Sequence, residues 1–184
     1  KIRYKQTAFG IGWAILQPFL MMVVFSVFFS RVVGPQNGVP YPIFSYAGLL
    51  LWNIFSNSLN NASQSLVSST NIIQKVYLPR IILPVASIIV TLVDFVFAFL
   101  IFCLILVFYR FVPNFWGFAL LPFLILLTFV ASLGLGLFLS AVNVKYRDVR
   151  YALPFFLQML IFVTPVIYPV SSIPQNFQWI LALN

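Results

Sequence analysis

The chain alternates long apolar stretches with short segments that hold most of its charged residues. Five of the stretches approach or exceed the length of about 20 residues that an α-helix needs to cross the hydrocarbon core of a bilayer. They lie at roughly 11–33, 43–65, 81–108, 116–142 and 153–169. The pattern therefore predicts an all-α fold, a polytopic membrane helix bundle with five spans and one transmembrane domain over residues 1–184.

The few charged residues indicate how the spans are oriented. Eight of the ten basic residues fall in three clusters: Lys1, Arg3 and Lys5; Lys75 and Arg80; Lys145, Arg147 and Arg150. Cytoplasmic loops of membrane proteins carry an excess of Lys and Arg. Five crossings that start in the cytoplasm place all three clusters inside and leave Arg31 and Arg110 outside. The first residues are therefore predicted to be cytoplasmic.

Composition excludes several functional classes. A chain that is 62% hydrophobic and 7% charged is too apolar for a soluble domain of 184 residues. Its net charge of +8 comes mostly from the predicted cytoplasmic loops, where it also attracts anionic lipid. Because no basic face exists outside those loops, we expect no nucleic-acid partner.

The residues needed for catalysis are scarce. The chain has no His and no Glu, its two acids are far apart, and its single Cys103 falls in the middle of a span. Paired carboxylates, a metal cluster or a Ser/His/Asp set cannot be assembled from these residues. The Gly-rich segment 134–140 lacks the Lys of a phosphate-binding loop. We expect a non-enzymatic chain that binds no cofactor and draws its energy from a partner or an ion gradient.

The second span changes from apolar to polar along its length. Five polar side chains share one helix face at about 100° per residue: Asn53, Asn57, Asn60, Gln64 and Ser68. The opposite side carries Leu51, Phe55, Leu59, Ala62 and Leu66. Amides are costly in lipid, so this face must meet protein or water. Two interpretations stay open, packing between helices through amide pairs and the lining of a hydrated path.

A short cytoplasmic element is predicted at 71–80, between the second and third spans. Asn71 is a plausible N-cap and Pro79 ends the element, while four residues share an apolar side: Ile72, Ile73, Val76 and Tyr77. The second inner loop, 143–152, contains Arg147, Asp148 and Arg150. That loop is either a topology anchor or a docking contact for a cytoplasmic partner.

Two features lie inside the third and fourth spans. Asp94 is an intramembrane acid, which suggests a proton relay or substrate contact. Its alternative role is structural, bonded to Ser, Thr or Asn on a neighbouring helix. Ser132, Gly136 and Ser140 recur every four residues and predict a seam of small residues that allows close helix packing.

The outer end of the fifth span is rich in proline. Pro165 interrupts the span and Pro169 closes it, and residues 171–184 follow as a segment too short to cross the membrane. That segment predicts a re-entrant or interfacial helix on the outer face. The chain begins without Met and stops just after an apolar segment, so we expect a fragment of a longer protein that lacks sequence at both ends.

The order of several motifs resembles a known family. The segments are RYKQTAFGIGWAILQPFL (3–20), YAGLLLWNIFSNSLNNASQSLVSSTNIIQKVYLPRIILPVASIIVTLVDF (46–95), NVKYRDVRYALPFFLQMLIFVTPVIYP (143–169) and IPQNFQWILALN (173–184). Together they resemble the permease of bacterial polysaccharide-export ABC transporters. That group is the type-2 exporter class, which moves O-antigen, capsule or teichoic-acid chains.

The resemblance implies a six-span subunit in the bacterial cytoplasmic membrane, of which this chain lacks the last span. It implies a homodimer with two cytoplasmic ATP-binding subunits, which carry ATP and Mg²⁺. The family's coupling helix corresponds to 71–80, with contacts expected from Asn71, Ile72, Lys75, Val76, Tyr77 and Arg80. Its second cytoplasmic contact corresponds to Lys145, Arg147, Asp148 and Arg150.

The function expected is export of a lipid-linked polysaccharide, with Asn53, Asn57, Asn60 and Gln64 lining the path. One alternative is a permease that exports a small drug or lipid on the same scaffold. Alternatives from other classes are a membrane-embedded glycan-modifying enzyme and a non-transporting scaffold.

Overall fold

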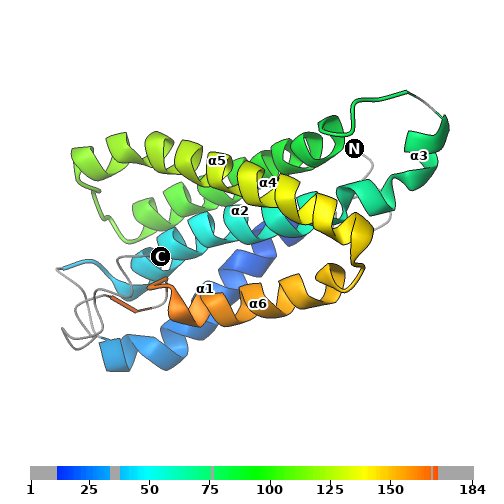
Figure 1. The fold of residues 1–184 in the computed structure, drawn as a ribbon. Coiled ribbons are helices and arrows are strands. Elements are labelled where there is room, and N and C mark those ends of the chain that lie inside the picture. The colour runs from blue at the N-terminus through cyan, green and yellow to red at the C-terminus, as the bar shows by residue number, and fades with distance from the viewer. Residues whose placement is uncertain (1–11, 34–37, 76, 167, 170–184) are drawn as a thin grey trace. The chain divides into compact units, whose positions relative to one another are not determined.

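The fold consists of α-helices. A computed structural model describes residues 12–33, 38–75, 77–166 and 168–169 (Figure 1). These residues form α1 (Gly12–Val33), α2 (Tyr41–Ser68), α3 (Thr70–Lys75), α4 (Ile82–Phe108), α5 (Phe115–Lys145) and α6 (Val149–Val163). The ranges just given contain no β-strand. The predicted all-α class is therefore confirmed.

The long helices coincide with the predicted spans. In the described part of the chain, α4 and α5 are long and apolar enough to cross a membrane by length and composition. Shorter apolar helical stretches cover Leu16–Ser30 and Val149–Val163. Helix α2 is 28 residues long, but Asn and Ser make up much of its second half and lower its hydropathy. The five-span topology thus stays a prediction, with four of its spans matched closely by α1, α2, α4 and α5.

The fifth span differs from its predicted bounds. Helix α6 begins at Val149 and ends at Val163, so it starts four residues before the predicted span and stops just before Pro165, the residue predicted to interrupt it. The hydroxyl of Tyr168 donates hydrogen bonds to the carbonyls of Phe162 (2.8 Å) and Val163 (3.1 Å). These bonds satisfy carbonyls that the ended helix leaves open, and Pro165 has no N–H to continue the ladder. The predicted outer helix at 171–184 lies outside the described residues.

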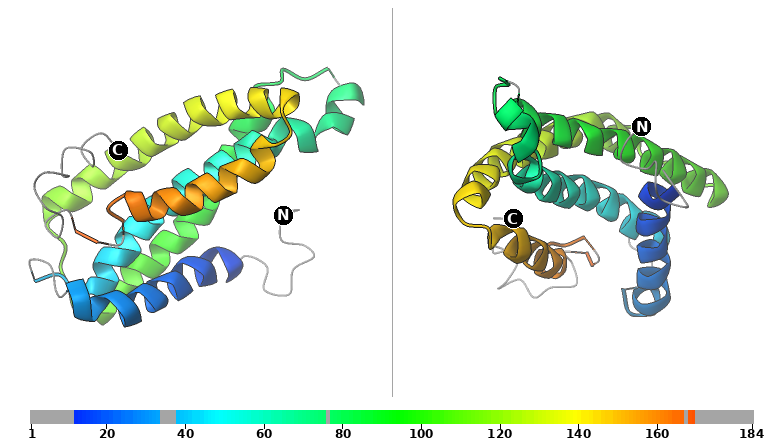
Figure 2. Two further views of the ribbon diagram at one scale, coloured as in Figure 1. Left: turned by 60° about the horizontal axis from the view of Figure 1, so that its bottom comes forward. Right: turned by 90° about the vertical axis from the view of Figure 1, so that its right-hand side faces the viewer.

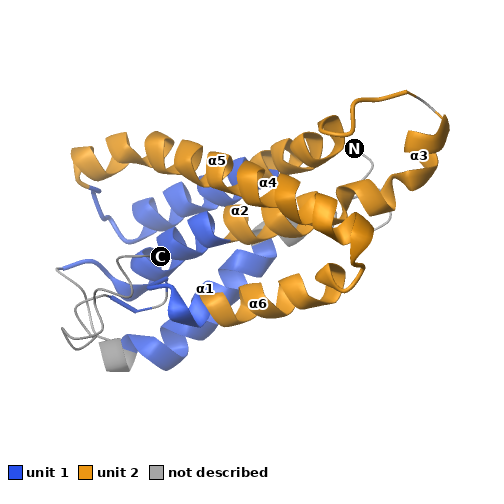
Figure 3. Ribbon diagram, viewed as in Figure 1, with its two compact units in different colours: residues 1–52, 94–113, 161–184 blue, residues 53–93, 114–160 orange. Residues whose placement is uncertain are grey.

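The chain forms two compact units (Figure 3). Unit 1 contains residues 1–52, 94–113 and 161–184, and unit 2 contains residues 53–93 and 114–160. Helices α2, α4 and α6 contribute residues to both units. Each unit is described separately below.

Unit 1 has an apolar and aromatic core. The hydroxyl of Tyr46 donates to the carbonyl of Ala98 (3.1 Å), and its ring stacks on Phe102 with centroids 6.0 Å apart. Gly48 allows close packing, because a Cβ there would lie 2.8 Å from the carbonyl oxygen of Val166. The buried residues of this core are Met22, Phe25, Tyr41, Ile43, Tyr46, Leu49, Leu50, Ala98, Phe102, Ile105, Leu106 and Val166.

Unit 2 is built on the predicted seam of small residues. The buried residues of α5 are Ser132, Gly136, Ser140 and Asn143, which lie on one helix face. A Cβ on Gly136 would lie 2.8 Å from the Cβ of Ala62, so α2 and α5 approach closely at this point. The side-chain amide of Asn143 donates to the carbonyl of Ser63 (2.8 Å) and joins the same two helices. The seam prediction is confirmed.

The connection between α4 and α5 is a capped turn. Arg110 adopts φ +50°. The amide of Phe111 donates to the carbonyl of Leu106 and the amide of Arg110 donates to the carbonyl of Val107, both at 3.0 Å. These two bonds with a left-handed residue are a Schellman motif, a position that usually favours Gly. Asn114 then caps α5, since its side chain accepts from the amide of Trp116 (3.4 Å).

Candidate functional site

The predicted coupling element contains a helix shorter than expected. Helix α3 begins at Thr70, so the prediction that Asn71 is its N-cap is wrong. The carbonyl of Ser69 accepts hydrogen bonds from the amides of Ile72 (2.9 Å) and Ile73 (3.1 Å). The helix therefore begins one residue before Asn71.

The end of this helix was also predicted incorrectly. It stops at Lys75, and the carbonyl of Pro79 accepts from the amide of Ile82 (3.0 Å), so Pro79 precedes α4 instead of ending α3. A residue before proline is biased toward extended backbone, which favours the open connection before Pro79.

The predicted apolar side of this element is described only in part. Tyr77 follows the helix and is fully exposed, Ile72 is 54% exposed, and Ile73 is partly buried. Val76 lies outside the described residues. Because α3 ends at Lys75, Tyr77 is not part of the helix. The shared apolar side stays a prediction, and Ile72 and Tyr77 are its exposed members among the described residues.

A pocket lies where the two predicted inner loops meet in unit 2. Helix α3, the start of α4 and the end of α5 lie at one end of this unit (Figures 1 and 2). The pocket has a volume of about 700 Å³. It is lined by Leu66, Val67, Thr70, Ile73, Gln74, Arg80, Ile81, Pro84, Leu137, Ser140, Ala141, Val144 and Arg147. The sequence had indicated the two loops separately but not that they enclose a common space.

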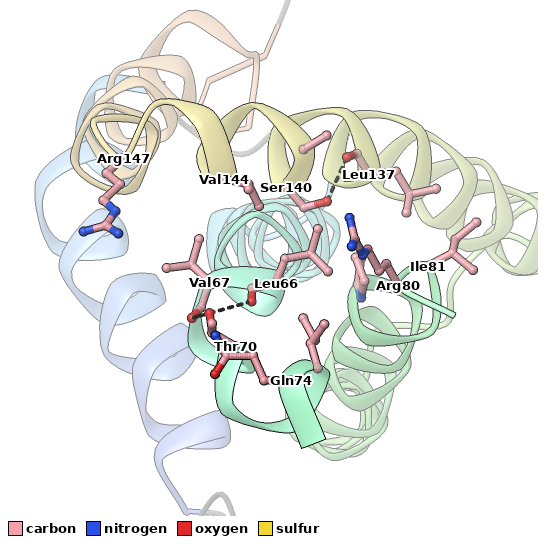
Figure 4. Close-up of a pocket in the computed structure, with 13 residues that line it drawn as sticks. Leu66, Val67, Thr70, Gln74, Arg80, Ile81, Leu137, Ser140, Val144 and Arg147 are labelled. Carbon is pink, nitrogen blue, oxygen red and sulfur yellow. Dashed lines mark hydrogen bonds between the residues drawn. The ribbon is translucent and has the colours of Figure 1, made fainter. Parts of the chain in front are cut away.

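Two of the predicted contact residues line this pocket, on opposite sides of it. Arg80 lines it on the α4 side and Arg147 on the side of the α5–α6 connection (Figure 4). The other basic residues of the two loops do not line it. Lys145 lies over the ring of Tyr146, with Nζ 5.2 Å from its centroid, and Arg150 lies beside Tyr151. The two loops thus divide their cations between the pocket and the outer surface.

The polar face of α2 lies on the less buried side of that helix. Asn53, Asn57, Asn60 and Gln64 are all half-buried. The side packed inside unit 2 is a different one, formed by Ile54, Ser58, Leu59, Ala62, Ser63 and Ser65. Of the residues predicted opposite the amides in this unit, Leu59 and Ala62 are buried. The amides are therefore not the main packing contact of α2 in unit 2.

Two other side-chain amides join helices of unit 2, and the sequence pattern did not distinguish them. The side-chain amide of Asn61 donates to the hydroxyl of Thr91 on α4 (3.4 Å), and Asn143 bonds to α2 as described above. Asn61 lies at the edge of the polar face predicted for the second span, and this position is the sequence signal that could have identified it. By contrast, the Oδ1 atom of Asn60 is buried and has no hydrogen-bond partner among the described residues.

Asp94 and the seam belong to different units. Asp94 is half-buried on the part of α4 in unit 1. The choice between a functional and a structural role for Asp94 stays a prediction. Ser132 and Ser140 are buried in packing, as the seam prediction requires.

Comparison with known proteins gives a consistent family. Residues 1–184 match the family described as "ABC-2 type transporter". The O-antigen export system permease protein RfbA of Myxococcus xanthus is 32% identical over all of this chain and 71% of its own length. An RfbA permease of Klebsiella pneumoniae is 27% identical with the same coverage. The polysialic acid transport protein KpsM of Escherichia coli is 24% identical over all of this chain and 72% of its own length.

Proposed function

The chain belongs to the ABC-2 type transporter family, and on that premise we propose that it is the permease subunit of an exporter of lipid-linked polysaccharide. Permeases of this family are integral membrane transport components that work with an ATPase. The observation that carries the proposal is the match of the whole chain to permeases named for O-antigen export and polysialic acid transport.

The open amide face of α2 supports a polymer as the substrate. A sugar chain is too polar to cross lipid, so its export needs a continuous hydrated lining. Asn53, Asn57, Asn60 and Gln64 are half-buried on one face, and side-chain amides can exchange hydrogen bonds with water or sugar hydroxyls. One helix face cannot enclose a polymer. The proposal therefore includes a second copy of the chain that completes the path.

A double substitution on this face tests the path. Replacing Asn57 and Asn60 together with Leu makes the lining apolar, and we expect the complex to assemble with its ATPase but to stop exporting polymer. Replacing the same two residues with Ser keeps the face polar, with hydroxyls in place of amides, and should preserve most export. If the Leu variant fails to assemble, the face serves packing; if it exports normally, the face has neither role.

The substrate class has its own test. Cells deleted for this chain should accumulate lipid-linked polysaccharide on the cytoplasmic side and display none outside, and expression of the full-length subunit should restore display. Unchanged display, together with loss of export of a small drug or a free lipid, would favour the alternative substrate. This outcome would leave the membrane permease assignment intact.

The coupling role rests on exposed side chains at the α3 end. Ile72 is more than half exposed and Tyr77 is fully exposed, at a helix of six residues that cannot span a membrane. An apolar surface outside the spans fits a groove on a partner. We propose that Asn71, Ile72, Lys75, Val76, Tyr77 and Arg80 contact a separate ATP-binding subunit, which holds ATP and Mg²⁺, with Lys145, Arg147, Asp148 and Arg150 as the second contact region.

Tyr77 gives the cleanest test of coupling. Because its ring is fully exposed, Tyr77→Ala should leave the fold unchanged while ATP hydrolysis continues without export. Tyr77→Phe keeps the ring and should retain coupling. Normal export by the Ala variant, measured beside a competent ATPase, would remove Tyr77 from the coupling contact.

Orientation in the bacterial cytoplasmic membrane is part of the same proposal. With Cys103 replaced by Ser, a Gln74→Cys variant should react with an impermeant maleimide only after the cells are permeabilised. An Asn114→Cys variant should react from outside, because Asn114 caps the start of α5 and Gln74 lines the pocket near the end of that helix. Labelling of the first variant in intact cells would reverse the topology.

A further inference from the structure

The pocket between α2, α3, α4 and α5 has the chemistry of an amphiphile site. We propose that it binds one anionic phospholipid of the surrounding bilayer, with the anionic headgroup between Arg80 and Arg147 and the start of an acyl chain along the apolar wall. This inference requires the chain to be in a membrane, which its family shows. It does not depend on the polysaccharide substrate.

The depth of the two arginines supports a lipid headgroup. Arg80 lies two residues before α4 and Arg147 two residues after α5, and both helices have the length and hydropathy of a membrane span. Side chains just beyond the ends of spanning helices lie at the level of the headgroups. Both cations therefore meet the membrane at the depth where lipid phosphate is found.

The charge of the pocket favours an anion. Of the thirteen lining residues none is acidic, and both cations are exposed to an incoming ligand. Asp148 follows Arg147 in sequence but does not line the pocket; its carbonyl accepts from the amides of Tyr151 (3.0 Å) and Ala152 (2.9 Å) at the start of α6. Arginine pairs with phosphate through two parallel hydrogen bonds. Thr70 and Gln74 add polar groups in the same lining.

The wall of the pocket distinguishes a lipid from free phosphate. Eight of the thirteen lining residues are apolar: Leu66, Val67, Ile73, Ile81, Pro84, Leu137, Ala141 and Val144. An inorganic anion gains nothing from these side chains, whereas an acyl chain buries them. The volume of about 700 Å³ is also far larger than a phosphate requires. The apolar wall between two cations thus matches an amphiphile with a phosphate head.

Paired charge variants of the full-length permease with its ATPase test this site. The complex is delipidated, titrated with phosphatidylglycerol in phosphatidylcholine nanodiscs, and bound lipid is counted by native mass spectrometry. Replacing Arg80 and Arg147 with Gln should weaken phosphatidylglycerol binding by at least about tenfold, because both side chains lose their charge-assisted hydrogen bonds to the headgroup. Replacing Lys75 and Arg150 with Gln removes the same charge from the same loops and should change binding little.

Two further arms identify the ligand. Ile81→Gln should weaken phosphatidylglycerol binding, and inorganic phosphate should fail to displace the lipid. Equal losses of phosphatidylglycerol affinity in the two double variants would mean that the overall positive charge of the loops binds the lipid, and would overturn the proposal. Displacement of phosphatidylglycerol by a polyprenyl diphosphate would assign the pocket to the export substrate instead. Loss of the ATP-binding subunits from the Arg80 and Arg147 variant, with phosphatidylglycerol binding unchanged, would make the two residues a protein contact alone and would also overturn the proposal.

Discussion

Replacing Gly136 with Ala tests whether α2 and α5 approach as closely as the structure indicates. The new Cβ would lie 2.8 Å from the Cβ of Ala62, well inside van der Waals contact, and neither atom is at the end of a flexible side chain. Overpacking of this kind costs about 1–3 kcal/mol. Against it, Gly→Ala inside a helix contributes about 0.5–1 kcal/mol of stability.

Gly134 separates these two effects. It lies on the same helix two residues earlier, and a Cβ there would meet no atom within 4 Å. Gly134→Ala should therefore show the helix contribution alone and be neutral or slightly stabilising. We expect Gly136→Ala to be less stable than Gly134→Ala by about 1–3 kcal/mol.

The measurement is unfolding of the full-length subunit in detergent micelles titrated with a denaturing detergent. Ala62→Gly removes the opposing Cβ, so the double variant Ala62→Gly with Gly136→Ala should recover stability relative to the sum of the single changes. A coupling free energy near 1–3 kcal/mol is expected for residues in direct contact. Equal midpoints for the Gly134 and Gly136 variants, or additive single changes, would refute the close approach.

Three smaller predictions concern single contacts. Arg110→Gly should stabilise the α4–α5 turn by about 1 kcal/mol, because a left-handed residue with a Cβ is strained there, whereas Arg110→Val should destabilise it; thermal unfolding in detergent ranks the two variants. Asn143→Ala should cost about 1 kcal/mol by removing the bond to the carbonyl of Ser63, and an unchanged unfolding midpoint would contradict that bond's importance. Tyr46→Phe removes only the hydroxyl that donates to Ala98 and should cost about 0.6 kcal/mol in the same assay, while Tyr46→Ala also removes the stacked ring and should cost more.

Much of the helical organisation of this chain could be predicted from its sequence. Hydropathy alone places α1, α2, α4 and α5, since a span must be about 20 apolar residues long whatever surrounds it. The seam at Ser132, Gly136 and Ser140 was also predictable, because four-residue spacing puts small side chains on one helix face. Both features follow from local geometry.

Other features depended on the tertiary structure. The bounds of α3 and α6 were misjudged because helix ends are set by hydrogen bonds to residues such as Ser69 and Tyr168, which propensity does not specify. The sequence pattern also left open which side of α2 is buried. Packing against Gly136 buries the side around Ala62 and leaves the amides half-open.

The pocket that Arg80 and Arg147 share is the clearest case of a feature that only the tertiary structure decided. The two residues are separated by α4 and α5, and nothing in their local sequence distinguishes them from Lys75 or Arg150. Antiparallel helices return the chain to the same end of unit 2, and this return places both arginines at one pocket. Sequence thus determined where the chain crosses and carries charge, while helix packing determined which charges share a site, because that contact depends on residues distant in the chain.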